Sequence, residues 1–239
     1  MIAITEIARG IYRVAFWDEP DLVSGGLLLP GITINLFVIA ADQPVLLHTG
    51  LRRTFRRVHE RVQAIVDPAQ LRYLVIPHHE GDSSGAINLW LEVAPRAVPL
   101  CSDLCASLSL RDFSDKEPRV VADGEVVDLG SHRLRFLITP QVNQWDSLMV
   151  YEETTRTLFP NDLFSSMGTE ITTAQDHSSA ALSSARDLGY QPDDRRHLIQ
   201  ALDKMSALDI QLIATMHGPT VTAQIDKLVR TFRDQPLSA

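Results

Sequence analysis

Four segments of the chain place metal-ligating side chains directly after an apolar run. These segments are His48-Thr49-Gly50, His78-His79-Glu80-Gly81-Asp82, Asn161-Asp162 and His217-Gly218. Sites are commonly built where strands end, because the strand is rigid and the loop after it is free to vary. The candidate ligands are two imidazoles and three carboxylates, from His78, Glu80, Asp82, Asp162 and His217. Such a donor set suits one or two divalent or trivalent metal ions.

The segment from His78 to Asp82 carries most of this signal. In an extended loop His78, Glu80 and Asp82 would point to one side, because alternate residues share a face. Taken alone, these residues fit a solvated loop or a structural pair as well as a metal site. Asp162 could likewise cap a turn, and His217 could begin the last helix. Only the four segments together favour a metal site.

Strands must precede each of these segments if the side chains are to converge. Apolar runs rich in Val, Ile and Leu predict a hairpin of strands at residues 33–41 and 44–48. Further short strands are expected at residues 71–77, 96–100, 119–121, 147–151, 157–159 and 211–215, with two more between turn dipeptides in 120–138. Each of the four candidate segments lies at or just past the end of a strand in this set.

Helices are expected between and after the strands. Leu51, Phe55, Val58 and Val62 recur at steps of three and four, which predicts an amphipathic helix that ends by Pro68. Similar patterns predict helices at residues 86–93, 198–208 and 221–232, while residues 169–191 have little pattern and are expected to form a surface loop. The mixture favours an α/β fold of two mixed sheets with helices outside.

Composition excludes several classes of protein. The 239 residues are 45% hydrophobic with a net charge of −8, which is typical of a globular chain and not of a disordered or collagen-like one. The longest Lys/Arg run is a pair, so neither nucleic acid nor an anionic membrane is an expected partner. Without an apolar stretch of membrane-spanning length or a signal-peptide pattern, we expect a cytoplasmic protein. Cys101 and Cys105, spaced as CxxxC, are expected to be reduced and buried.

In this order the motifs resemble those of the metallo-β-lactamase superfamily, whose fold is an αββα four-layer sandwich. The loop from His78 to Asp82 is closer to the HxExDH pattern of flavodiiron and oxygen-binding diiron proteins than to the HxHxDH pattern of the hydrolases. TPQVNQWDSLMVY (residues 139–151), LFPND (158–162) and ATMHGP (214–219) resemble the later ligand segments of the same proteins. The resemblance extends from about residue 35 to residue 219.

The resemblance implies a first metal position held by His78, Glu80 and Asp162. The family has a histidine where this chain has Asn143, which is a weak neutral ligand. Loss of an imidazole leaves an oxygen-rich set, which favours iron or manganese over zinc. Such a position would keep open coordination sites for O2, NO or water.

A second metal position is implied by the same resemblance. It would share Asp162 and add Asp82 and His217, but the family histidine directly after Asp82 is Ser83 here. The early acid of the family is also replaced, by His48. Three imidazoles remain as possible substitutes or as support for the ligands: His48, His79 and His177.

The resemblance implies a non-haem iron protein that binds or reduces O2 or NO. One alternative is a metal-dependent hydrolase that uses a metal-bound hydroxide, although Glu80 in place of the hydrolase histidine argues against it. Another is a non-catalytic sensor that has lost the metal, which Ser83 and Asn143 favour.

Flavodiiron proteins carry an FMN-binding flavodoxin domain after the lactamase-like core, and about 20 residues follow Pro219 here, too few for such a domain. We therefore expect a single domain over residues 1–239, no FMN in this chain and an external electron donor protein. The resemblance also implies a homodimer.

Overall fold

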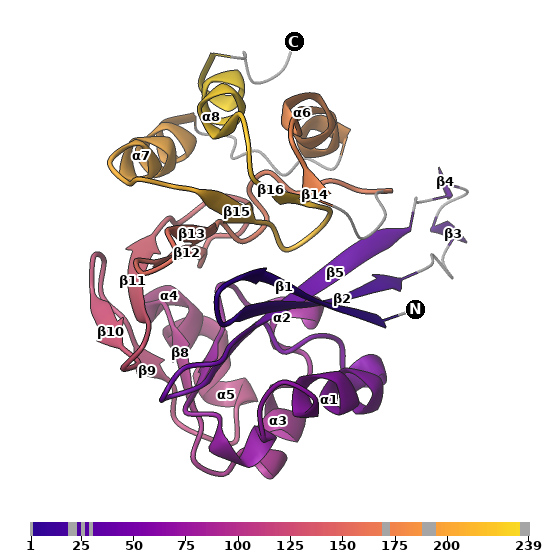
Figure 1. Cartoon of the computed structure of the whole chain (residues 1–239), viewed down its shortest axis with the longest axis vertical. Helices are drawn as coiled ribbons and strands as arrows, with labels where there is room; N and C mark the ends of the chain where they lie inside the picture. Colours follow the sequence, from indigo (N-terminus) through magenta and orange to yellow (C-terminus); the bar gives the residue numbers. More distant parts are fainter. Residues whose placement is uncertain are drawn as a thin grey trace.

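The computed structural model describes residues 2–18, 23–24, 27–28, 31–168, 173–187 and 195–234. Within these residues the strands form two large sheets that pack face to face, with helices on both outer faces (Figure 1). The α/β fold class and the αββα layering expected from the sequence are confirmed. No helix of the described residues is long and apolar enough to span a membrane.

The first sheet contains seven strands of the described chain. Their order is β1 (Ile2–Ala8), β2 (Ile11–Asp18), β5 (Ile32–Ile39), β6 (Val45–Leu47), β7 (Tyr73–Val75), β8 (Val98–Cys101) and β9 (Arg119–Val120). Strands β1 to β6 pair antiparallel, including the predicted β5–β6 hairpin, and β6 to β9 pair parallel. Strands β1 and β2 have no counterpart among the predicted segments, because β1 carries no buried residue and Arg13 interrupts the apolar run of β2.

The second sheet also contains seven described strands. Their order is β10 (Val126–Asp128), β11 (Arg133–Ile138), β12 (Leu148–Glu152), β13 (Thr157–Phe159), β15 (Leu212–Ala214), β16 (Thr220–Val221) and β14 (Thr173–Ala174). Strands β10 to β13 form an antiparallel meander, and β13 pairs parallel with β15. Strands β3 (Val23–Ser24) and β4 (Leu27–Leu28) pair antiparallel in a separate small sheet.

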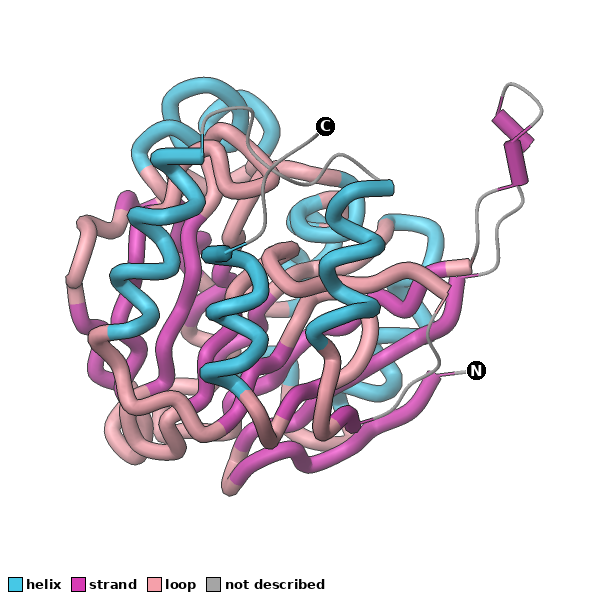
Figure 2. The backbone as a smooth tube through the Cα atoms, turned by 90° about the horizontal axis from the view of Figure 1, so that it is seen from above, coloured by secondary structure: helices cyan, strands magenta, loops and turns pink. Residues whose placement is uncertain are grey.

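Helices cover the outer face of each sheet. Helices α1 (Phe55–Gln63) and α3 (Ile87–Val93) lie on the first sheet, and α6 (Ser178–Asp187), α7 (Arg195–Ser206) and α8 (Ile225–Asp234) lie side by side over the second (Figures 1 and 2). The remaining helical segments are η1 (Arg52–Thr54), η2 (Pro68–Gln70), α2 (Gly81–Ser84), α4 (Asp103–Cys105), the π-helical turn η3 (Ala106–Leu110) and α5 (Arg111–Phe113).

Two sequence-based expectations for the C-terminal third are wrong. Residues 173–174 and 178–187, expected to be loop, form β14 and α6, because α6 packs against the core through Ala181, Ala185 and a single large apolar side chain, Leu182, which is too few to mark a helix face. Residues 169–172 and 188–191 of the same segment lie outside the described residues. The last helix begins at Ile225, and Val221 lies in β16 instead.

Three hydrophobic layers correspond to the three interfaces of the sandwich. Phe37 and Phe159 lie between the sheets with ring centroids 5.0 Å apart. Phe164 and Phe232 lie between the second sheet and its helices, 4.9 Å apart and nearly perpendicular. Burying one such ring contributes about 1.5–3 kcal/mol. Each sheet therefore has apolar residues on both faces, and its strands pack against the other sheet on one face and against helices on the other.

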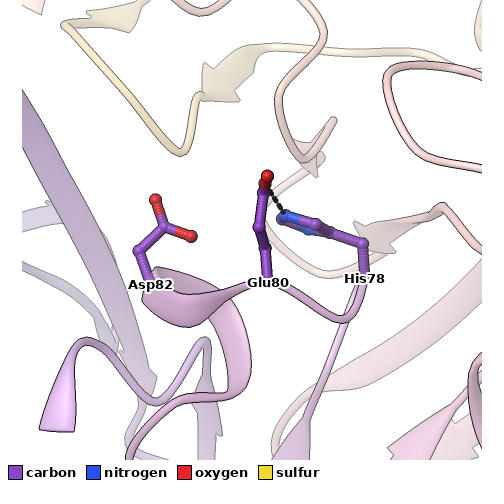
Figure 3. A group of neighbouring side chains, drawn as sticks. All are labelled: His78, Glu80 and Asp82. Atoms are coloured by element: carbon purple, nitrogen blue, oxygen red, sulfur yellow. Dashed lines mark hydrogen bonds and ion pairs between the residues drawn. The ribbon is translucent and has the colours of Figure 1, made fainter. Parts of the chain in front are cut away.

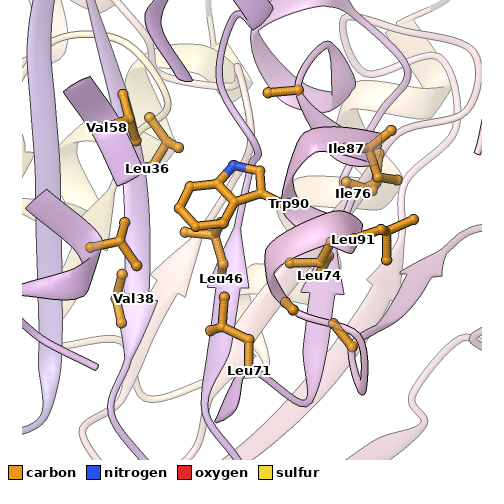
Figure 4. Packing of buried hydrophobic residues seen from close by; sticks show 14 of the residues in the cluster. Leu36, Val38, Leu46, Val58, Leu71, Leu74, Ile76, Ile87, Trp90 and Leu91 are labelled. Atoms are coloured by element: carbon orange, nitrogen blue, oxygen red, sulfur yellow. The ribbon is translucent and has the colours of Figure 1, made fainter. Parts of the chain in front are cut away.

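Trp90 occupies the centre of the layer between the first sheet and its helices (Figure 4). Its ring is fully buried, and its Nε1 donates a hydrogen bond of 2.9 Å to the carbonyl oxygen of Thr49. This bond ties α3 to the turn after β6, in which His48 and Gly50 have φ of 61° and 75°. A Cβ at Gly50 would lie 3.3 Å from Leu36, so both the backbone conformation and the packing favour glycine there. The core thus holds the first candidate segment in place.

The two cysteines behave as expected from their spacing. Cys101 and Cys105 are both fully buried and form no disulfide. Cys105 lies at the start of the helical segment after β8, where its backbone N–H donates to the side chain of Ser102. They belong to the core of the first layer.

Candidate metal centre

The four candidate segments come together at the carboxyl ends of strands from both sheets. His48 follows β6 and His78 to Asp82 follow β7 in the first sheet, whereas Asp162 follows β13 and His217 follows β15 in the second. Strands β6 and β7 are parallel neighbours in the first sheet, and β13 and β15 are parallel neighbours in the second. The carboxyl ends of each pair therefore lie at one edge of its sheet. The centre is therefore built half from each sheet.

The loop after β7 differs from the extended loop expected from the sequence. Glu80 is extended, with φ −142° and ψ 163°, but the chain then turns into α2, which places Asp82 in a helical turn. The ligand atoms of His78, Glu80 and Asp82 nevertheless all lie within 4.8 Å of one another (Figure 3). The expected alternation of side chains along an extended loop is therefore wrong for Asp82. The turn into α2 at Gly81 brings Asp82 to the group instead.

Glu80 is the part of the centre nearest to solvent, and it contacts the buried His78. His78 is fully buried, and its Nε2 lies 2.9 Å from Oε2 of Glu80 and 3.4 Å from Oδ2 of Asp162. The Glu80 side chain is 49% exposed, so the centre opens toward solvent on this side. Gln144 Nε2 donates a hydrogen bond of 3.1 Å to the other carboxylate oxygen of Glu80.

His217 faces the other half of the centre. Its Nε2 lies 3.3 Å from Oδ1 of Asp162 and 3.4 Å from Oδ2 of Asp82. Its Nδ1 lies 3.0 Å from the carbonyl oxygen of Thr33, which can only accept, so Nδ1 carries the proton of that bond. A bond of this kind fixes the ring and aims the other nitrogen of a ligand histidine at the metal.

Asp162 is the shared residue of the centre. Its side chain is 2% exposed, and its two oxygens face different imidazoles, Oδ2 toward His78 and Oδ1 toward His217. A carboxylate in this orientation can bridge two metal ions. Asn161 before it has φ of 60°, a left-handed conformation that asparagine tolerates better than most residues.

Burial and mutual charge govern protonation at the centre. Burial lowers the pKa of His78, but Asp162 and Glu80 outweigh it and raise that pKa to about 9. Burial also opposes the shift at His217, whose pKa is raised by Asp162 and Asp82. Burial would raise the pKa of Asp162, yet His78 and His217 hold it well below its usual range. Protons on the imidazoles thus balance the carboxylates, and a metal ion would displace them.

The hydrogen bonding of Asp82 indicates that the residues of the centre fit a metal ion. Its Oδ1 is buried and accepts no hydrogen bond from the described residues, and burial raises its pKa. A buried carboxylate oxygen without a partner is unfavourable. A cation held by two imidazoles and three carboxylates would satisfy it, so the donor set fits iron or manganese.

The two positions that lack the family histidines hold hydrogen-bonding residues. Asn143 donates through Nδ2 to Oδ2 of Asp162, from a backbone with φ of 70°. Its amide nitrogen thus faces the shared carboxylate, and its role as a weak ligand stays a prediction. Ser83 is buried, and its Oγ lies 3.1 Å from Nδ1 of His48.

The structure separates the three possible substitute histidines. His48 is 1% exposed, and its ring lies 6.5 Å from that of His78. Burial, with a smaller contribution from His78, lowers the pKa of His48 to about 3, so its ring is neutral. His79 instead contacts Ser84 Oγ through Nδ1 and packs on Phe113.

His177 also has another role. Its Nε2 lies 3.1 Å from the carbonyl oxygen of Phe164 and donates to it. Two residues that the sequence prediction did not include support the loop after β7: the buried Asp146 accepts from the backbone N–H of His79 at 2.8 Å, and Ser102 Oγ donates to the Asp146 carbonyl. Asp146 lies in the segment around Trp145 that the resemblance covers, which is the one signal that could have indicated it.

A family model decides how the resemblance is to be understood. The model described as ODP family beta lactamase matches residues 32–218, which include all four segments of the centre. The chain belongs to this family. The resemblance to the metallo-β-lactamase superfamily is thereby confirmed.

Two curated relatives of this family member are named as flavin-containing proteins. Diflavin flavoprotein A 1 of Thermosynechococcus vestitus is 27% identical over 233 residues, a match that covers 93% of this chain and 40% of that protein. Flavo-diiron protein FprA2 of Clostridium acetobutylicum is 26% identical over 205 residues, covering 81% of this chain and 50% of that protein. The chain thus spans half or less of the length of these relatives.

A solved structure agrees with the layering described above. Rubredoxin oxygen:oxidoreductase from Desulfovibrio gigas aligns with a TM-score of 0.84 at 20% sequence identity. The alignment covers 98% of this chain and 63% of that chain. The fold of this family member is therefore the metallo-β-lactamase-like fold of the flavodiiron proteins.

Proposed function

We propose that this protein holds one or two non-haem iron ions with His78, Glu80, Asp82, Asp162 and His217, and binds or reduces O2 or NO there. The observation that carries the proposal is the position of Asp162, whose two oxygens face two different imidazoles. Bound iron would supply electron exchange and open coordination positions. Manganese and zinc are the other ions that this donor set could take.

The side chains around the ligands support a small-molecule site. The exposed side of Glu80 gives O2 or NO a route from solvent. Asn143 and Gln144 place amide N–H groups on the carboxylates of Asp162 and Glu80, and these bonds hold both acids in fixed orientations. The carbonyl of Thr33 does the same for His217. The chain therefore presents a preorganised set of donors.

The relatives support the source of electrons that we propose. The Desulfovibrio gigas protein is named for both rubredoxin and oxygen. By analogy, we propose that a separate donor protein supplies electrons to this centre. The homodimer remains a prediction from the resemblance.

Metal content and optical spectra test the proposal directly. We expect protein from iron-supplemented medium to retain at least one iron ion per chain and to develop an absorption band after exposure to air. His217→Gln should lose iron, whereas His197→Gln, which changes a histidine on α7, should keep it. Failure to retain iron, manganese or zinc after reconstitution would overturn the proposal and favour a non-catalytic sensor. Bound zinc with ester hydrolysis would favour the hydrolase.

A further inference from the structure

The helical segment that follows β6 carries a dense group of arginines. Five of the 22 Lys and Arg residues of the chain fall within residues 52–61, and only one acidic residue, Glu60, lies in the same range. Because the whole chain has a net charge of −8, this group is a local region of opposite sign. It is called here the arginine face and consists of Arg52, Arg53, Arg56, Arg57 and Arg61.

The arginine face lies on the outer surface of the molecule. Helix α1 covers the outer face of the first sheet (Figure 1), and it buries Val58 and Val62 on the side toward that sheet. All five arginines of the face are exposed. The side chain of Arg56, for example, is 94% exposed. The buried contacts of α1 therefore come from its apolar side, and the guanidinium groups face solvent.

The positive charge of the arginine face is only partly neutralised within the chain. On α8, Lys227 pairs with Asp176 at 2.5 Å. Within the arginine face, Arg56 lies 3.7 Å from Glu60, the one carboxylate of the segment. Three members of the face form no ion pair with any residue that the structure describes: Arg52, Arg57 and Arg61. Their charge is therefore available to a partner of opposite sign.

The arginines are placed where they do not stabilise α1. Arg57 lies four residues from both Arg53 and Arg61, and like charges at this spacing destabilise a helix slightly. The first turn of α1 contains no acidic residue but includes Arg56 and Arg57, although negative charge is the favourable one at this end of a helix. Stability of the helix therefore does not account for the face. The positive end of the helix dipole instead adds to the charge of the arginines.

This positive end of α1 lies beside the candidate metal centre. The backbone N–H of Thr49 donates to the carbonyl of Ser83 in α2 at 2.7 Å. A Cβ at Gly81 would lie 3.7 Å from the side chain of Leu51. Arg52 is the next residue in the chain, and Gly81 is itself exposed. A protein bound to this end of the arginine face would therefore lie beside the loop after β7.

We propose that the arginine face is the docking surface for an electron-donor protein with an acidic surface. Under the function proposed above, on which this inference rests, a separate donor protein supplies the electrons. Complementary charges steer two proteins together and fix their orientation. The net charge of −8 would otherwise repel an acidic donor, so a local positive surface beside the centre is what such a donor requires.

An anionic membrane fits this face less well than an acidic protein. Helices that bind at a membrane surface combine basic side chains with large apolar side chains that enter the lipid. The large apolar side chains that are exposed in the described chain lie outside η1 and α1: Ile4, Leu104, Leu108 and Phe113. The arginine face thus offers charge without an apolar anchor.

An acidic rubredoxin is the probe that tests this inference, and metal-free protein is sufficient for the measurement. We expect the wild type to bind oxidised rubredoxin in a calorimetric titration at about 20 mM salt. Binding should be at least about tenfold weaker at about 200 mM salt, because salt screens exposed charges. The double substitution Arg57→Glu and Arg61→Glu should weaken binding at the lower salt concentration by at least about tenfold, which is about 1.4 kcal/mol.

Arg230→Glu is the matched control for Arg57→Glu. Arg230 is exposed on α8, over the other sheet, and forms no ion pair with a described residue. Both substitutions change the net charge equally, but Arg230→Glu should change the affinity less than about twofold, because distant charges are screened. Glutamate is a good helix former, so circular dichroism should show unchanged helix content in every variant.

Equal affinity of the wild type and the double variant for rubredoxin would overturn the inference, and so would no binding by the wild type at about 20 mM salt. Binding of phosphatidylserine vesicles or duplex DNA through the same arginines, without binding of rubredoxin, would overturn it in favour of another polyanion. Iron retention is measured separately. Protein that retains iron but does not bind rubredoxin contradicts this inference alone, whereas protein that binds rubredoxin but retains no iron contradicts the proposed function.

Discussion

Asp162 places one negative charge between two imidazoles that approach it from different sheets. Because His78 and His217 contact separate oxygens of its carboxylate, either imidazole depends on it for its orientation and for its raised pKa. Burial alone would make this carboxylate costly. The residue is therefore the point at which metal binding and stability of the metal-free protein are most directly linked.

Asp162→Asn should weaken metal binding and also lower the stability of the metal-free protein. The amide removes the charge shared by the two imidazoles, so we expect loss of bound metal and a fall of about 3 kcal/mol in the unfolding free energy of metal-free protein at pH 7. Metal analysis and urea unfolding measure the two effects. Asp123→Asn removes a surface carboxylate that pairs with Lys204 and should cost less than about 1 kcal/mol. Equal effects of the two substitutions would contradict the central role of Asp162.

Asn143→His should strengthen the first metal position. The backbone at residue 143 has φ of 70°, a conformation in which histidine is among the better tolerated side chains. An added imidazole should raise iron affinity by about tenfold or more, equal to about 1.4 kcal/mol. Competition with a chelator measures the change. Asn143→Ala, which only removes the hydrogen bond to Asp162, should not raise affinity.

A histidine at position 83 requires a different design. Ser83 Oγ already lies 3.1 Å from the His48 ring, so a second imidazole there would occupy the same space. Restoring the family pattern at this position therefore needs Ser83→His together with His48→Asp. No gain in metal occupancy from the pair would mean that position 83 is aligned incorrectly.

Residue type and order were enough to single out five side chains that the structure brings together, since each follows a strand. That they bind metal stays a prediction. The supporting contacts could not be predicted in this way. Thr33 accepts a hydrogen bond from His217, and Gln144 donates one to Glu80, although each pair is far apart in the sequence. The hydrogen bond from Asn143 to Asp162 depends on a left-handed backbone at residue 143, which the residue type alone does not determine.

At the scale of the element, the hairpin of β12 and β13 is closed around a buried carboxylate. Glu152 accepts hydrogen bonds from the backbone N–H groups of Thr154 and Thr155, at 2.9 and 2.7 Å, and from the Thr155 hydroxyl. His132 Nδ1 lies 3.1 Å from its Oε1. Burial raises the pKa of Glu152, but these bonds outweigh it and the net shift is downward.

The direction of this shift gives a pH dependence. A carboxyl group whose pKa is lower in the folded state stabilises the fold above its unfolded pKa of about 4.3, and this contribution is lost as the pH falls through the folded pKa. We expect Glu152→Gln to be less stable than wild type at pH 7, with the difference shrinking below about pH 4. Urea unfolding at several pH values measures it.

Thr155→Val should show the same trend on a smaller scale. This substitution removes the hydroxyl donor of Thr155 but keeps its backbone N–H bond to Glu152.

A stability difference between Glu152→Gln and wild type that stays constant from pH 7 to pH 3 would contradict the role assigned to the carboxylate. The turn itself would then account for the stability.

Strongly patterned elements were the ones predicted from the sequence. Helix α1 buries Val58 and Val62 and exposes its charged residues, so its period is visible. Helix α6 packs through two alanines and a single leucine, and α2 is a single turn at the centre, so neither has a pattern strong enough to detect. Their conformations depend on the layers they pack against.

At the scale of the whole molecule, the two sheets are joined beside the centre by Asn35 of β5. Its backbone N–H donates to the Met216 carbonyl at 2.9 Å, and its Nδ2 donates to the carbonyls of Thr215 and Gly218 at 2.9 and 3.0 Å. The His217 turn of the second sheet is thereby attached to a central strand of the first.

Asn35→Ala should loosen this attachment. Two buried carbonyl groups would lose their donor, so we expect the unfolding free energy to fall by about 2–4 kcal/mol. Metal affinity should fall by about 10–100-fold, because the ring of His217 would be less well oriented. Asn88→Ala removes an exposed amide that donates to Phe113 and serves as the matched control. Unchanged metal affinity in Asn35→Ala would show that the His217 turn holds its position without this bond.

The division of the candidate ligands between the two sheets has a kinetic consequence. His78, Glu80 and Asp82 belong to the first half of the chain, whereas Asp162 and His217 belong to the second. A complete binding site forms only after long-range pairing of the two halves, which is the slow part of folding for such a topology. A metal ion would then be captured late in folding, so it would slow unfolding and leave the refolding rate nearly unchanged.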